Sequence, residues 1–140
     1  IYFGISLNIT AALGSYTFGY LEDKLGSKRV IIISLLSLIS ICSIILIIDN
    51  KTIFWILGIS IGLFIGSIQS SSRTALVNIS EKAELNSMFG LYAVSGKITN
   101  FLGPFLVATL TTLFNSQKAG MASIILFLII GLILLQKTKI

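Results

Sequence analysis

The sequence predicts an all-α membrane protein with five transmembrane helices, and three observations support this prediction. Of the 140 residues, 55% are hydrophobic and only 11% are charged, whereas soluble domains carry about 25% charged residues. The mean hydropathy is +1.01. Several apolar segments are each long enough to cross a bilayer, which takes about 20 residues. None of them resembles a barrel strand, which would alternate polar and apolar residues over about 10 positions.

Charged or polar breaks separate the apolar segments, so we expect spans at 1–18, 30–48, 53–72, 88–114 and 119–135. Lys and Arg gather at alternate breaks. One side carries seven of them and the other only two, Lys51 and Lys118. Basic residues in short loops stay in the cytoplasm, so we expect residue 1 outside and the C-terminus inside. The richness in Ile, Lys, Asn and Ser favours a bacterial cytoplasmic membrane. The seven Lys and Arg residues on the side predicted to be cytoplasmic are Lys24, Lys28, Arg29, Arg73, Lys82, Lys137 and Lys139.

Several function classes are excluded by composition. The chain has no histidine and one cysteine, so it predicts no Cys/His metal site, no disulfide framework and no bound cofactor. It has no phosphate-binding loop, and its scattered basic residues form no nucleic-acid patch. The acidic residues all fall in predicted breaks, which leaves no carboxylate inside a span for proton coupling. These acids are Glu22, Asp23, Asp49, Glu81 and Glu84.

Lys97 is the sharpest clue to function, because it lies near the middle of the segment 88–114. A lysine at that depth costs about 2.5–3.5 kcal/mol on insertion scales. Asn100 and Pro104 follow on the same helical face, and Gly103–Pro104 predicts a bend. We expect Lys97 and Asn100 to line a substrate path. The alternative is a structural lysine held by backbone carbonyls or by an acid elsewhere.

The segment 53–72 carries Gly58, Gly62 and Gly66 at a spacing that lets a neighbouring helix approach closely. We expect the same stripe to continue to Gln69 and Arg73. Two roles stay open for Gln69, which could line the substrate path or make an interhelical hydrogen bond. Two roles also stay open for Arg73, which could snorkel to the membrane interface or form a gate by pairing with an acid such as Glu81 or Glu84. Polar content therefore places 53–72 and 88–114 toward the interior and 30–48 and 119–135 at the periphery.

The break GYLEDKLGSKR resembles the signature loop of the major facilitator superfamily. Glycines there allow a tight turn, and bases hold the loop at the inner membrane surface. The resemblance implies that this loop helps to latch the cytoplasmic side. The matching positions are Gly19, Asp23, Lys24, Gly26, Lys28 and Arg29.

The stretches 54–73 and 88–104 resemble the vacuole-effluxer family of that superfamily, which includes amino-acid effluxers of autophagy and bacterial permeases. One position departs, since Ser87 stands where an acid commonly precedes the Phe–Gly pair. The resemblance runs over nearly the whole chain. Its positions are Phe54, Trp55, Gly62, Gly66, Gln69, Ser72, Arg73, Phe89, Gly90, Tyr92, Gly96, Lys97, Gly103 and Pro104.

The resemblance implies a twelve-helix bundle of two halves, of which residues 1–140 are the last five helices. The expected partners are therefore the bilayer, a small-molecule substrate and the missing N-terminal half. The expected function is secondary active transport of a small solute, such as an amino acid or another carboxylate, by alternating access. The rival is a non-transporting membrane scaffold. A membrane enzyme is disfavoured, because the chain supplies neither an activated nucleophile nor a metal site.

Overall fold

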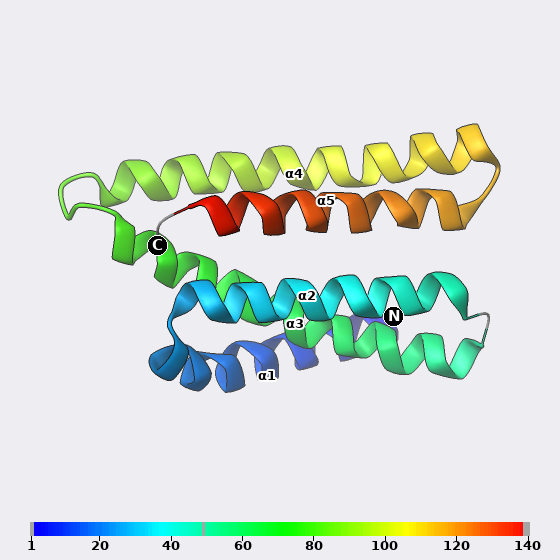
Figure 1. The fold of residues 1–140 in the computed structure, drawn as a ribbon, viewed down its shortest axis with the longest axis horizontal. Helices are drawn as coiled ribbons and strands as arrows, with labels where there is room; N and C mark the ends of the chain where they lie inside the picture. The colour runs from blue at the N-terminus through cyan, green and yellow to red at the C-terminus, as the bar shows by residue number, and fades with distance from the viewer. Residues whose placement is uncertain (1, 49, 139–140) are drawn as a thin grey trace.

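The computed structural model describes residues 2–48 and 50–138, which form α-helices joined by short turns. The predicted all-α fold of five helices is confirmed. The chain runs alternately up and down, so that α1, α3 and α5 all end at the same end of the bundle (Figure 1). Asp49 and Lys139 lie outside the described residues. The helices are α1 (Tyr2–Leu25), α2 (Ser27–Ile47), α3 (Lys51–Ile79), α4 (Leu85–Phe114) and α5 (Gln117–Lys137).

The helices α2, α3, α4 and α5 are long and apolar enough to cross a membrane, by length and composition. Within the described residues α1 is not among them, although it has 24 residues. Polar residues such as Asn8, Thr10 and Thr17 lower its apolar character. Several of these side chains donate hydrogen bonds to backbone carbonyls. Thr10 of α1 donates one to the carbonyl oxygen of Ile59 in α3 at 3.0 Å. The crossing of the membrane by the segment 1–18 stays a prediction.

Local residue chemistry explains where the chain turns. Gly26 alone separates α1 from α2, and its φ of 83° lies in the region that glycine adopts without strain. Asn50 caps α3, because its side chain accepts a hydrogen bond from the backbone N–H of Thr52 at 2.9 Å. Asn115 ends α4 in the left-handed conformation, with φ of 48°.

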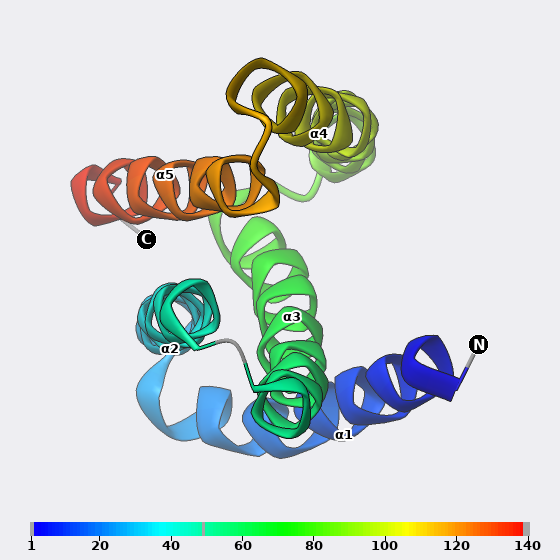
Figure 2. The same ribbon diagram turned by 90° about the vertical axis from the view of Figure 1, so that its right-hand side faces the viewer.

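In space the helices follow the order α1, α3, α2, α5, α4 (Figure 2). The helix α3 packs against both α1 and α2, α2 packs against α5, and α5 packs against α4. A small apolar core joins α2, α3 and α5. It consists of Ile31, Leu35 and Ala75, packed against the partly buried Ile68, Leu128, Leu132 and Leu135.

The prediction that the segment 30–48 is peripheral is wrong within this chain. The helix α2 has more buried residues than any other described helix, including Val30 and Ser34, which are fully buried. In contrast, α4 has no buried residue among those described. Apolar content cannot distinguish a lipid-facing helix from a helix packed between others, because both environments favour Ile and Leu. The central place predicted for α3 agrees with its contacts.

Candidate functional site

The interface between α1 and α3 is built on glycine. A Cβ atom at Gly66 would collide with the backbone carbonyl of Ala11, and one at Gly14 would collide with that of Leu63. A Cβ atom at Gly58 would lie 2.7 Å from the ring of Phe3. These glycines therefore allow the two backbones to approach closely.

The stripe of glycines does not continue to Gln69 and Arg73 as expected. Gly62 and Gly66 are buried against α1, whereas Gln69 and Arg73 are exposed. Gln69 and Arg73 follow Gly66 by three and seven residues and lie on nearly the same side of the helix, so their exposure depends on where α1 covers α3. The buried positions of α3 continue instead through Ser67, Ser71 and Ala75. The described structure contains no ion pair between Arg73 and Glu81 or Glu84.

The residues predicted for a substrate path lie on two separate helices. Lys97 and Asn100 are exposed on α4, and Gln69 is exposed on α3. These two helices make few contacts with each other, so this chain does not bring the three side chains together. No hydrogen bond between side chains of the described residues involves any of them.

The helix α4 runs without interruption through Gly103 and Pro104. Proline has no N–H, so the carbonyl of Asn100 lacks its usual helical donor. One face of α4 therefore presents an ammonium group, a side-chain amide and an unsatisfied carbonyl near one another. Such a face can bind an anionic group next to a hydrogen-bond donor.

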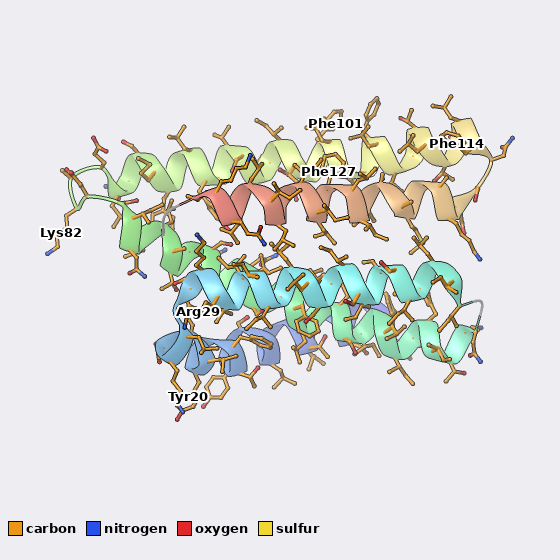
Figure 3. All side chains as sticks on the ribbon, viewed as in Figure 1. Tyr20, Arg29, Lys82, Phe101, Phe114 and Phe127 are labelled. Carbon is orange, nitrogen blue, oxygen red and sulfur yellow. The ribbon has the colours of Figure 1, made fainter. Side chains whose placement is uncertain are left out.

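The end of the bundle where α1, α3 and α5 terminate, which we call the basic end, carries most of the positive charge. Figure 3 shows Tyr20, Arg29 and Lys82 there, and Phe114 at the opposite end. The alternation along the sequence of breaks rich and poor in Lys and Arg therefore matches the helix topology. The basic residues described at this end are Lys24, Lys28, Arg29, Arg73, Lys82 and Lys137.

The predicted signature loop is mostly helical. Gly19, Asp23 and Lys24 lie in α1, and Lys28 and Arg29 lie in the first turn of α2. The apolar run ends at Phe18, but the helix continues because residues such as Glu22 and Lys24 favour the helix about as well as Leu does.

Two of the basic residues at this end have clear partners. Lys28 donates from Nζ to the carbonyls of Gln136, at 3.5 Å, and Thr138. It thereby places a positive charge at the C-terminal end of α5, where the helix dipole is negative. The Nζ atom of Lys24 lies 4.7 Å from the centre of the Tyr20 ring. A cleft with a volume of about 490 Å³ lies beside Lys28 and is lined by Leu25, Gly26, Ser27, Lys28, Arg29, Asn78 and Ile79.

Glu22 is the residue that the sequence analysis placed wrongly. It lies inside α1, three residues before the helix ends, and only 8% of its surface is exposed. Its Oε2 atom accepts a hydrogen bond from Ser71 of α3 at 2.9 Å. Its Oε1 atom is buried and has no hydrogen-bond partner. Glu22 therefore belongs to a helix and is buried in the bundle, whereas the sequence analysis placed it in a break between spans.

The signal that could have found Glu22 was its register. Glu22 follows the close-contact residues Ala11 and Gly14 by eleven and eight residues, which places it on the same side of a helix. A prediction based on hydropathy alone places any carboxylate in a loop between helices. The pairing with Ser71 depends on the close approach of α1 and α3, and no composition argument contains that information.

Comparison with known proteins agrees with the helical arrangement. The family model described as Major Facilitator Superfamily matches residues 3–139. A protein from Bacillus subtilis (strain 168), named "Uncharacterized MFS-type transporter YxiO", is 26% identical over 127 residues. The match covers 91% of this chain and 30% of that relative, so the chain spans less than a third of its length. No solved structure matches. The chain therefore belongs to the major facilitator superfamily.

Proposed function

We propose that this chain is the C-terminal part of a secondary transporter that moves a small solute across a membrane by alternating access. The observation that supports this most strongly is the polar face of α4, with Lys97 and Asn100, on a helix with no buried residue. In a superfamily member, such a face suits a path between two halves of a bundle. The missing N-terminal half would cover it.

We further propose that the substrate carries a carboxylate, as amino acids do. An ammonium group in a partly dehydrated path favours an anionic partner, and a charge-assisted hydrogen bond contributes about 1.5–3 kcal/mol. The resemblance of 54–73 and 88–104 to the vacuole-effluxer family supports the same class. The seven-to-two charge pattern supports a cytoplasmic C-terminus, and the Bacillus relative supports a bacterial cytoplasmic membrane.

The test is uptake of radiolabelled amino acids into proteoliposomes that contain the complete gene product. We expect saturable uptake, and we expect Lys97→Ala to raise KM about tenfold or more, the lower bound set by that hydrogen bond. Lys97→Arg should keep part of the activity, and Lys82→Ala, in an exposed turn, serves as the matched control. The hypothesis fails if Lys97→Ala transports normally while Lys97→Arg, through bulk alone, does not.

A scaffold is the second candidate, favoured by the glycine-based packing of α1 on α3. Close helix packing of this kind serves assembly as well as transport. The same proteoliposome experiment separates the two functions, because a scaffold shows no saturable flux for any solute. A fusion of a fluorescent reporter to the C-terminus tests the orientation, since such a reporter fluoresces only inside the cell.

A further inference from the structure

The cleft at the basic end is a cavity that the proposed path on α4 does not explain. Its lining comes from the turn at Gly26, from the first turn of α2 and, through Asn78 and Ile79, from the last turn of α3. Figure 3 shows Arg29, one of the lining residues, at this end of the bundle. None of the described residues that line the cleft is acidic. The cleft therefore offers positive charge and hydrogen-bond donors without a carboxylate beside them.

The backbone N–H groups in the first turn of α2 have no acceptor within the described part of the chain. Gly26 holds the N-cap position, where a side-chain oxygen usually accepts from these groups, and glycine has none. No hydrogen bond joins the N–H of Ser27, Lys28 or Arg29 to a described residue. A Cβ atom at Gly26 would meet nothing within 4 Å, so the approach to these groups is open. Free N–H groups at the positive end of a helix dipole attract anions.

Ser27 gives a second and independent indication of a ligand. It lines the cleft, and only 6% of its surface is exposed. Buried hydroxyl groups almost always have a hydrogen-bond partner. The hydroxyl of Ser27 has none among residues 2–48 and 50–138. A ligand in the cleft would supply the missing partner, and it would do so next to the free N–H groups of the same turn.

Two basic side chains belong to the same cleft. Arg29 is exposed and makes no ion pair or hydrogen bond with another described residue. Lys28 donates to carbonyls of α5, which are neutral, so its positive charge is not cancelled. The nearest acids in the sequence lie elsewhere, because Glu22 is bonded to a hydroxyl of α3 and Asp23 lines a separate recess on α1. The cleft therefore favours an anionic ligand.

A phosphate group fits these donors better than a carboxylate does. The oxygens of a tetrahedral phosphate point in several directions, so they can accept from backbone N–H groups, a hydroxyl and a forked guanidinium together. The two oxygens of a carboxylate lie in one plane with its carbon. Small-molecule sites have volumes of about 300–1,000 Å³. A cleft of about 490 Å³ has room for the organic group that a phosphate ester carries.

We propose that this cleft is a phosphate-binding site, which takes the phosphate group of a membrane phospholipid or of a small soluble phosphate. The N–H groups of the first turn of α2 and the hydroxyl of Ser27 donate to the phosphate oxygens. Arg29 makes a bidentate contact, and Lys28 adds electrostatic attraction. The bound phosphate also caps α2, which lacks a side-chain cap. The inference does not depend on the proposed transport function, because the site shares no residue with the path on α4.

The first experiment measures amide hydrogen exchange of the complete gene product in maltoside micelles, which contain no phosphate. Added inorganic phosphate should slow exchange in the segment 26–30, and potassium chloride at the same ionic strength should not. Arg29→Gln and Ser27→Ala should each raise the Kd for phosphate about tenfold or more. Arg29→Lys, which keeps the charge and loses the fork, should lose less. Lys82→Gln removes one exposed positive charge from the same end and is the matched control.

The second experiment distinguishes the two sources of phosphate. Phosphatidylglycerol is added to the micelles in place of inorganic phosphate, and exchange in 26–30 is measured again. Protection that Arg29→Gln abolishes and Lys82→Gln retains would assign the site to a phospholipid. Protection by inorganic phosphate alone would assign it to a soluble phosphate.

Two outcomes would overturn the proposal. Protection by neither probe would show that the donors of the cleft are satisfied by another part of the complete protein. An equal loss of protection in Arg29→Gln and Lys82→Gln would show diffuse attraction to a basic surface, with no defined site. Neither readout uses flux, so both hold whether or not the protein transports a solute.

Discussion

The interface of α1 with α3 and the outer face of α4 lie in one small bundle, yet they are built on opposite principles. At the first, glycines bring two backbones together, and polar side chains such as Thr10 and Ser71 bond across the contact. At the second, no residue is buried, and large apolar side chains such as Phe101, 70% exposed, point away from the other helices (Figure 3).

The difference shows which surfaces this chain completes by itself. The contact of α1 with α3 is closely packed, and hydrogen bonds from Thr10 and Ser71 cross it without any other chain segment. The face of α4 combines Lys97 and Asn100 with exposed aromatic residues such as Phe101, which follows Lys97 by four residues and lies beside it on the same side of the helix. Substitutions on the two surfaces should therefore affect different properties, namely stability at the first and transport at the second.

The largest effect on stability is expected for Gly66→Leu. The added side chain must displace the backbone of Ala11, and such overpacking costs about 3 kcal/mol or more. Gly131→Leu is the matched control, because a Cβ atom there meets nothing within 4 Å. Reversible unfolding in mixed micelles measures both variants. Equal stability of the two would show that α1 and α3 are not closely packed.

A smaller loss is expected for Ser34→Ala. The hydroxyls of Ser34 and Ser67 lie 2.7 Å apart between α2 and α3, and both side chains are fully buried. Interhelical hydrogen bonds of this kind contribute about 1 kcal/mol in membrane proteins. Ser37→Ala on the same helix removes a hydroxyl that bonds only within α2, to Ile33 O. A double-mutant cycle with Ser67→Ala should recover the coupling, and additive effects would argue against the bond.

A local loss is expected for Lys28→Ala at the basic end. The ammonium group bonds carbonyls at the C-terminus of α5, and a charge at a helix end contributes about 0.3–1 kcal/mol. Amide hydrogen exchange should become faster in the last turn of α5 and remain unchanged in α4. Lys28→Arg should restore the protection. Lys82→Ala, in the turn before α4, should leave it unchanged, and faster exchange there would contradict a specific cap.

The smallest effect on stability, with the largest on transport, is expected for Lys97→Leu. The side chain makes no contact that helps to hold the described helices together, so the stability should change by about 0.5 kcal/mol or less. KM for uptake should rise about tenfold or more, as for Lys97→Ala, because the ammonium group is the proposed substrate ligand. Unfolding and uptake are measured on the same preparation. A marked loss of stability would place Lys97 in a structural role.

Much of the candidate site could be located in the sequence, but its partners could not. Lys97 and Asn100 were recognisable because polar groups are rare in apolar segments. The glycines are buried while Gln69 and Arg73 are exposed, and this difference could not be predicted because it depends on how α1 crosses α3. The burial of Glu22 depends on the same crossing. A charged residue beyond an apolar run is predicted to be exposed unless a neighbouring helix is known to cover it.

The sequence by itself determined the number of helices, their alternating direction and the end that carries the positive charge. These features follow from local quantities, namely apolar runs, turn residues such as Gly26 and Asn50, and the count of Lys and Arg in each break. Only the tertiary structure decided that α2 packs between α3 and α5, that α4 has no buried residue among those described and that Ser71 meets Glu22. The physical reason is that lipid and helix neighbours favour the same apolar side chains, so contact between helices depends on the shape of their surfaces.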